Sequence, residues 1–139
     1  MMAGDIGNGA FYYCTALITF SAKNMEGDIS NSAFENCEEL TSVYARKMKA
    51  TLGERAFNGC TKLTSITLGA AGTTSYIDTR AFEDFTTTGN CNLTFTKNPD
   101  GTINTKANTW TVGTKTWTFK SITTNSDAKD PASQSAKTP

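Results

Sequence analysis

The sequence predicts an α/β fold: a short repeat solenoid of about four repeats of about 23 residues, each a strand plus one helical turn, with a C-terminal β-hairpin cap. Three observations support this prediction. One motif recurs along the first 95 residues, the apolar residues within it keep their spacing, and turn signals typical of β-hairpins follow the last copy. Such self-similarity indicates stacked repeats, because each repeat can bury its apolar side only against its neighbours.

The motif is clearest in residues 52–68, which read Leu-Gly-Glu-Arg-Ala-Phe-Asn-Gly-Cys-Thr-Lys-Leu-Thr-Ser-Ile-Thr-Leu. Other copies begin at Ile6, Ile29 and Ile77, and the Ala-Phe pair recurs at intervals of 23, 23 and 25 residues. A period in the low twenties is typical of the leucine-rich class of solenoid. The last copy is interrupted, because Phe85 takes the cysteine place and residues 86–90 are inserted.

Stacking of these repeats places equivalent residues in columns. The spacing Ala-Phe-x-x-Cys-x-x-Leu favours one helical turn that leads into a strand. We expect the core to contain a phenylalanine column and an aliphatic column: Phe11, Phe34, Phe57 and Phe82, and Ile6, Ile29, Leu52 and Ile77. The alternation after the leucine predicts a further set of inward-pointing residues. These are Ile18, Phe20 and Ala22, then Thr41, Val43 and Ala45, then Thr64, Ile66 and Leu68.

The strand residues between those positions point outward and form the candidate partner-binding surface. A row of small hydroxyls on a rigid sheet suits recognition, and it is also what any solvated sheet face looks like. The connector after the second strand carries the only dense basic run, which is either a patch for an acidic partner or a solvated loop. The candidate residues are Thr19, Ser21, Ser42, Tyr44, Ser65 and Thr67 on the strands, and Arg46, Lys47 and Lys49 in the connector.

The motif of residues 52–68 resembles the BspA-like leucine-rich repeat family of bacterial surface proteins, and the resemblance covers residues 6 to about 95. It implies a protein-interaction or adhesion module that is displayed on a cell surface or secreted, and that contacts host or matrix proteins. One departure is the connector at residues 45–51, where the family usually has a proline. The resemblance also implies that the cysteine of the motif is a buried structural position.

After residue 95 the sequence predicts two β-hairpins. The turn signal Asn98-Pro99-Asp100-Gly101 should fold residues 93–97 back onto 102–105. A second turn at Gly113-Thr114 should place Trp110 opposite Trp117. The expected domains are therefore a leucine-rich repeat solenoid at 1–95, a β-hairpin C-terminal cap at 96–122 and a polar flexible tail at 123–139.

The composition argues against several function classes. Thirteen basic and thirteen acidic side chains cancel, so no net charge recruits nucleic acid. The chain has no histidine, the commonest general base and metal ligand, and we expect no enzymatic activity, no metal and no cofactor. No apolar run reaches the roughly 20 residues of a membrane-spanning helix. The first residues lack the features of a signal peptide, so the protein is either cytoplasmic or a trimmed form of an exported one, and the resemblance favours the latter.

Cys14, Cys37 and Cys60 recur at the 23-residue spacing. They could be metal ligands or disulfide partners, but the chain lacks the C-x-x-C clusters and histidines of zinc sites, which favours small buried thiols. Cys91 lies outside this column, so we expect it to be exposed and reactive.

Two alternative functions remain open. A surface glycan could stack on Trp110, Trp117 or the Tyr44 region, although the core of the capping hairpins is the favoured place for the tryptophans. The chain could instead be a structural spacer in a larger surface protein. Only five residues precede Ile6, so the first repeat lacks a cap, and we expect this end to be covered by another chain, by self-association or by missing sequence.

Overall fold

The computed structural model describes residues 5–48, 52–69, 80–82, 90–96, 102–112 and 115–129. These residues form eight strands in two sheets and contain no helix. The larger sheet has five strands in the order β1-β2-β3-β4-β8, and the smaller has three in the order β5-β6-β7. The strands are β1 Thr19–Ser21, β2 Ser42–Ala45, β3 Ser65–Leu68, β4 Asn92–Phe95, β5 Thr102–Asn104, β6 Thr109–Val112, β7 Lys115–Thr118 and β8 Ser121–Thr124.

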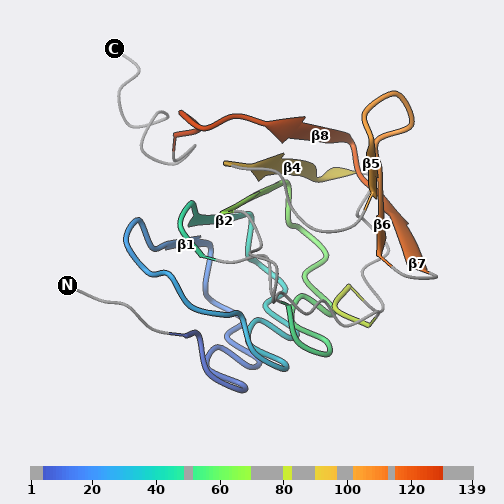
Figure 1. The fold of residues 1–139 in the computed structure, drawn as a ribbon. Helices are drawn as coiled ribbons and strands as arrows, with labels where there is room; N and C mark the ends of the chain where they lie inside the picture. Colours follow the sequence, from blue (N-terminus) through green and yellow to red (C-terminus); the bar gives the residue numbers. More distant parts are fainter. Residues whose placement is uncertain are drawn as a thin grey trace, which may run out of the picture.

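The larger sheet is parallel throughout, as expected for a solenoid in which each repeat contributes one strand. Figure 1 shows its strands one above another, with the turn-forming parts of the first repeats gathered at the lower edge of the view. The register follows the repeat, since Phe20 pairs with Val43 and Val43 pairs with Ile66. Bridges from Ile6 to Ile29 and from Ile29 to Leu52 extend the pairing to the start of each repeat.

The predicted helical turn is wrong: the described residues at that place form consecutive β-turns. In the second repeat the Ala33, Glu35 and Cys37 amides donate to carbonyls three residues earlier, at 3.2 Å each. The amides between them, of Ser32, Phe34 and Asn36, donate instead to the next repeat at 2.8, 2.9 and 2.7 Å. A helical turn would direct every amide along its own axis, rather than alternately into the turn and toward the neighbouring repeat.

Left-handed residues make this alternation possible. Each of the first three repeats has two residues with positive φ, at equivalent places: Gly9 and Tyr13, Ser32 and Asn36, Arg55 and Gly59. A residue in this region reverses the direction of the next peptide unit, so successive amides point alternately into the turn and along the stack. Asn and Gly accept this conformation readily, whereas Tyr13 adopts it at a φ of 56° despite its bulk.

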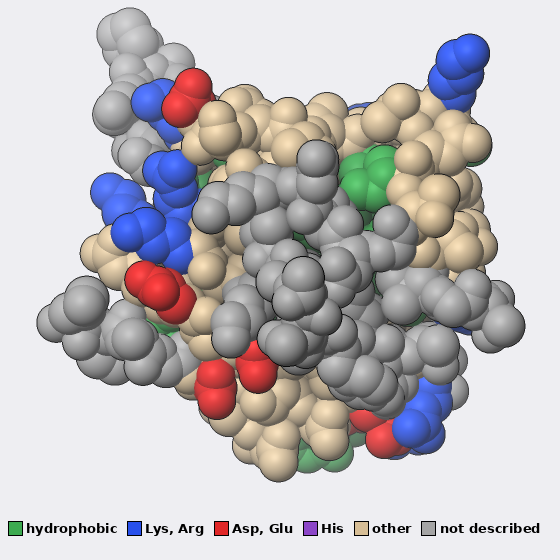
Figure 2. Space-filling view, viewed as in Figure 1, with side chains coloured by type: hydrophobic (Ala, Val, Ile, Leu, Met, Phe, Trp, Pro, Cys, Tyr) green, Lys and Arg blue, Asp and Glu red, His purple; other side chains and the backbone are tan. Residues whose placement is uncertain are grey.

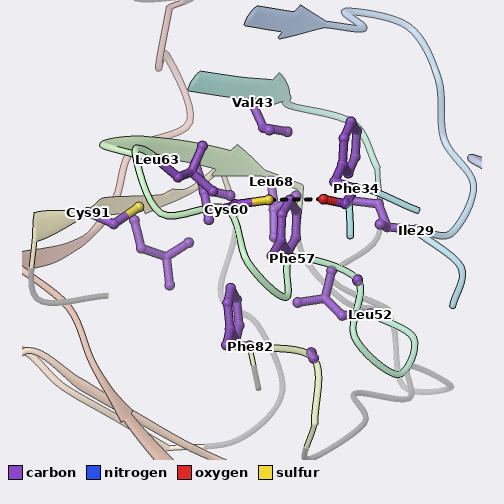
Figure 3. Packing of buried hydrophobic residues seen from close by; sticks show 14 of the residues in the cluster. Ile29, Phe34, Val43, Leu52, Phe57, Cys60, Leu63, Leu68, Phe82 and Cys91 are labelled. Carbon is purple, nitrogen blue, oxygen red and sulfur yellow. Dashed lines mark hydrogen bonds between the residues drawn. The ribbon is translucent and has the colours of Figure 1, made fainter. Parts of the chain in front are cut away.

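The phenylalanine column is confirmed. Successive rings of Phe11, Phe34, Phe57 and Phe82 stack with centroids 5.3, 5.5 and 5.6 Å apart and with interplanar angles of 7°, 4° and 11°. Figure 3 shows three of these rings in line beside the aliphatic column. In that column Ile6, Ile29 and Leu52 are buried, and Ile77 lies outside the described residues.

One predicted inward position is wrong. Ile18 is 59% exposed and Thr64 is exposed, whereas Phe20, Val43 and Ile66 lie in or against the core. The wrong position comes just before the strand begins. There the Thr41 and Thr64 hydroxyls donate to the backbone carbonyls of the preceding repeat, Ile18 O at 3.0 Å and Thr41 O at 3.1 Å. A side chain held to the neighbouring backbone in this way does not enter the core.

The second predicted hairpin is confirmed, and the first is not. Val112 pairs with Lys115 and Trp110 pairs with Trp117, as the sequence predicts. Strand β5, however, pairs with β6 in the smaller sheet, whereas β4 lies between β3 and β8 in the larger one. Strand β4 pairs with β3 along one edge and with β8 along the other, so neither edge is free for β5. Its buried residues, Leu93 and Phe95, continue the core of the preceding strands. Residues 98–101 and 113–114 themselves lie outside the described part.

Strand β8 was not expected. Its Ile122 is buried and pairs with Leu93, so residues 121–124 extend the parallel sheet. Residues 121–122 fall in the predicted cap, and residues 123–124 fall in the predicted flexible tail. The three-stranded sheet is therefore an excursion between two adjacent strands of the solenoid, β4 and β8. Its tryptophans reach the core, with Trp117 5.1 Å from Phe82 and Trp110 5.1 Å from Phe95.

Candidate partner-binding surface

The outward positions of the parallel strands line up in two rows, which we call the hydroxyl face. The register aligns Thr19, Ser42, Ser65, Asn92 and Ser121 in one row, and Ser21, Tyr44, Thr67, Thr94 and Thr123 in the other. Neighbouring side chains bond across the strands. The Ser121 hydroxyl donates to Asn92 Oδ1 at 2.7 Å, and the Thr94 and Thr123 hydroxyl oxygens lie 3.3 Å apart.

The hydroxyl face is only partly open. Thr19 and Ser21 on β1 are exposed, and Ser65 is half-buried. Ser42, Tyr44 and Thr67, which the sequence places outward and available to a partner, are buried with 8%, 3% and 3% exposed. The middle of this face is therefore covered, and the predicted accessibility of these three residues is wrong.

The segment that follows β8 contacts the second repeat at Tyr44 and Arg46. We call residues 125–128 the strap. The Tyr44 hydroxyl donates to the Ala128 carbonyl at 3.0 Å, and Arg46 Nη2 donates to the Ser126 carbonyl at 2.9 Å. The Asn125 amide anchors the start of the strap by donating to the Phe95 carbonyl at 2.8 Å. The predicted flexible tail from residue 123 is therefore ordered as far as the strap, because the sheet and two side chains of the second repeat hold it.

In the described part of the connector, residues 45–48, the two basic side chains lie in different environments. Arg46 is half-buried and bonded to the strap, Lys47 is exposed, and Met48 is fully buried in the core. Lys49 lies outside the described residues. Figure 2 shows Lys and Arg side chains gathered on one side of the molecule beside Asp and Glu side chains, so both signs of charge share this face.

The cysteine column is confirmed for two of its three members. Cys37 and Cys60 are buried, and each thiol donates to the phenylalanine carbonyl of the preceding repeat at 3.0 Å. Figure 3 shows the bond from Cys60 to the Phe34 carbonyl. Burial raises the pKa of Cys37 to about 11 and that of Cys60 to about 12. Cys14, in the first repeat, is half-buried. All four cysteines are free.

The prediction for Cys91 is wrong. Its side chain is fully buried, and burial raises the pKa of its thiol to about 12. The residue directly precedes β4 and aligns with Thr64 in the register, but unlike Thr64 it turns into the core. Cys91 is therefore a structural thiol.

The aromatic residues proposed for glycan stacking are not accessible. Trp110 is fully buried, Trp117 is 5% exposed, and their rings lie 5.4 Å apart within the core. Tyr44 lies under the strap. Among the described residues, the exposed aromatic side chains are Tyr12 and Tyr13, at 51% and 55%, and their rings meet edge to face with centroids 4.5 Å apart. Partial desolvation of the ring hydroxyl, followed by the neighbouring Tyr13 and Glu35, raises the pKa of Tyr12.

Within the described residues, no group of three or more histidine, cysteine or acidic side chains is placed to hold a metal ion. The same part of the chain has no helix that is long and apolar enough to cross a membrane.

Sequence reasoning missed β8 and the strap. A signal for β8 was present, because Ser121-Ile122-Thr123 repeats Ser65-Ile66-Thr67, and Phe119 takes the place of Leu63. Phe119 is buried and packs against Phe82 with centroids 5.5 Å apart. The strap has no comparable signal, since its contacts run from two side chains to backbone carbonyls.

Comparison with protein families gives one match. The model described as BspA type leucine-rich repeat region (6 copies) covers residues 4–126. The match extends past residue 95 and includes β8, whereas the resemblance noted from the sequence stopped before the hairpins. Comparisons with curated proteins and with solved structures give no match.

Proposed function

Since the chain belongs to the BspA-type leucine-rich repeat family, we propose that it is a non-enzymatic interaction module that binds a protein partner through the open part of the hydroxyl face. Leucine-rich repeat domains generally mediate protein interactions, which supports the general class. The narrower proposal is adhesion to host or matrix proteins by a module of bacterial origin that is displayed on the cell surface or secreted.

The observation that carries this proposal is the repeated outward row that begins at Thr19 and Ser21 on β1. These hydroxyls sit on an edge strand whose other side packs Phe20 against Phe11 and Phe34, so they are held at fixed spacing. Preorganised polar groups cost little entropy on binding. Lys47, exposed at the end of β2, adds a positive charge near this surface.

The size of the face limits its affinity. Five strands at about 4.8 Å spacing give a width of about 19 Å, and strands of four residues are about 13 Å long. The product, about 250 Å², is well below the roughly 800 Å² per partner of a standard interface. A single module should therefore bind weakly, and several modules or a longer parent protein would raise the apparent affinity by avidity.

A binding array of immobilised matrix proteins and glycans tests the proposal. We expect Thr19→Glu and Ser21→Glu to weaken binding to the protein ligand found, because both side chains are exposed on the hydroxyl face. Thr15→Glu is the matched control, since Glu38 occupies the same place in the second repeat. The proposal would be contradicted if the folded chain captured no protein, or if the control lost as much binding as the two variants. A structural spacer would then be the better account of the chain.

The exposed pair Tyr12 and Tyr13 supports glycan binding as a second candidate. Tyr13 holds a left-handed conformation where the later repeats have Asn36 and Gly59. Such strain in a bulky residue motivates a search for function. We expect Tyr12→Ala to abolish any glycan signal on the array. If Tyr12→Ala leaves that signal intact, the pair is not the site.

The two ends of the stack also enter the proposal. We propose that the sheet β5-β6-β7 acts as the C-terminal cap, because Trp117 and Phe119 lie against Phe82 at the end of the phenylalanine column. We propose self-association at the opposite end, where Ile18 is exposed beside the half-buried Phe11 and Leu17.

A further inference from the structure

We propose that Tyr44 and Arg46 form a binding site for a peptide main chain, and that the strap occupies this site in cis as a built-in competitor. The ligand class is a polypeptide segment that offers two carbonyl oxygens, two residues apart, and a small side chain at the second of them. This inference rests on the proposed protein-binding function. It names the kind of partner that the covered middle of the hydroxyl face would bind, and the segment that regulates access to it.

The two side chains bond to the backbone of the strap and not to its side chains. The Arg46 guanidinium and the Tyr44 hydroxyl each donate to a carbonyl, of Ser126 and Ala128 respectively. Every non-proline residue offers such an acceptor, so any segment of the same conformation could make both bonds. The one side chain of the strap that is buried is Ala128, at 8% exposed, which sets the requirement for a small residue there.

The two donors are departures from the repeat. The outward place of Tyr44 is filled by Ser21, Thr67 and Thr94 in the other strands. The place of Arg46 is filled by Lys23 one repeat earlier and by Gly69 one repeat later. The solenoid therefore stacks without a tyrosine or an arginine at these positions. What the pair adds to the fold is the contact with the strap.

The strap is fastened lightly. Asn125, Ser126 and Asp127 are exposed, and the strap folds on itself through the Ala128 amide, which donates to the Asn125 carbonyl at 3.1 Å. A short exposed turn with one buried methyl opens at far lower cost than the strands below it. Opening leaves two oriented donors on a rigid strand end. Thr96 supports them by donating its hydroxyl to the Arg46 carbonyl at 2.8 Å.

The first test asks whether the pair holds the strap. Hydrogen exchange is measured in the full chain at the Asn125 amide, which bonds to the Phe95 carbonyl. We expect Tyr44→Phe combined with Arg46→Ala to speed this exchange by about tenfold or more. Lys23→Ala, at the place of Arg46 one repeat earlier, should leave the rate unchanged. An unchanged rate in the double variant would overturn the proposal.

The second test asks whether the open site binds a peptide in trans. The probe is a fluorescent peptide with the sequence of residues 123–131, followed by anisotropy. Ala128→Arg in the full chain removes the small buried side chain and should release the strap while Tyr44 and Arg46 stay in place. We expect this variant to bind the probe at least about tenfold more tightly than the unaltered chain, whose site is mostly occupied.

Two controls complete the second test. Adding Tyr44→Phe and Arg46→Ala to the Ala128→Arg chain should abolish binding, and a probe carrying arginine at the place of Ala128 should not bind. Equal binding by the opened and unaltered chains, binding that survives loss of the pair, or unchanged exchange at Asn125 in the Ala128→Arg chain would each overturn the proposal. An opened chain that binds no probe also overturns it. That result does not contradict the proposed function. The proposed function is tested separately, by the binding array with Thr19→Glu and Ser21→Glu, and these residues lie outside the strap.

Discussion

Phe34 lies between the rings of Phe11 and Phe57, at 5.3 and 5.5 Å, and has no exposed surface. Truncation at this place removes ring contacts with two repeats at once and leaves a cavity that rigid turns cannot close. We expect Phe34→Ala to lower the free energy of unfolding by about 3–5 kcal/mol, measured by urea denaturation. Tyr12→Ala, at a half-exposed ring, is the control and should cost far less. A Phe34→Ala chain as stable as the control would contradict the column.

The buried thiols should make the folded protein less stable at alkaline pH. Burial raises the pKa of Cys60 and Cys91 from 9.0 to about 12, so the folded thiols stay neutral at a pH where the unfolded ones ionise. The contribution of such a thiol to the free energy of unfolding is fully present below the pKa of the unfolded chain. It is lost as the pH rises from that value to the pKa of the folded chain. We expect the free energy of unfolding to fall between pH 9 and 12, by up to about 1.4 kcal/mol per pH unit and thiol.

Urea denaturation at pH 8, 9 and 10 measures this fall, and Cys91→Ala is the control that should make it shallower. Thiol labelling of the native chain gives a second measurement. Cys14 should react first, because it is half-buried, and Cys37, Cys60 and Cys91 should react only after denaturant is added. Rapid labelling of Cys91 in the native chain would restore the exposed position that the sequence suggested.

At the level of the elements, the turns pack so closely that one glycine has no room for a side chain. A Cβ on Gly53 would lie against Asn31 Oδ1 and within 2.7 Å of the Ser30 backbone carbon. We expect Gly53→Ala to cost about 1–3 kcal/mol. The matched control is Gly7→Ala, at the same place in the first repeat, where nothing lies within 4 Å. Equal effects of the two substitutions in thermal unfolding would contradict the close stacking of the turns.

Strand β8 makes the clearest difference between the expected and the observed elements. Ile122 is buried and pairs with Leu93, so Ile122→Ala should lower the free energy of unfolding by about 2–5 kcal/mol. Thr124→Ala, on the same strand but exposed, should change it by less than about 0.5 kcal/mol. If β8 were part of a flexible tail, both substitutions would be neutral in chemical denaturation.

For the whole molecule, the two ends of the stack differ. Phe82 at one end is covered by Trp117 and Phe119, whereas Ile18 near the other end is 59% exposed. We expect sedimentation velocity to show self-association that grows with protein concentration and is weakened by Ile18→Lys, because a buried charge opposes apolar contact. Thr15→Glu is the control outside this apolar patch. A chain that stays monomeric at every concentration would contradict self-association at this end.

The candidate surface could be predicted only in part. The 23-residue repeat aligns Thr19, Ser42 and Ser65, and the period of two along each strand places them on the same face. The register confirms this alignment. Which of them a partner can reach depends on the strap, which joins residues about 80 positions apart in the chain. Bonds from side chains to a distant backbone leave no periodic trace in the sequence. Tyr44 was therefore predicted on the right face and with the wrong exposure.

The sequence by itself determined the stack of repeats, since the regular return of Phe, Cys and aliphatic residues allows only an arrangement in which equivalent places touch. It also determined the Trp110–Trp117 pair, because a two-residue turn sets the pairing by counting. Only the tertiary structure decided the β-turns in place of a helical turn and the position of the strap. These depend on which neighbour satisfies each backbone amide and carbonyl, and that choice is made across repeats rather than along the chain.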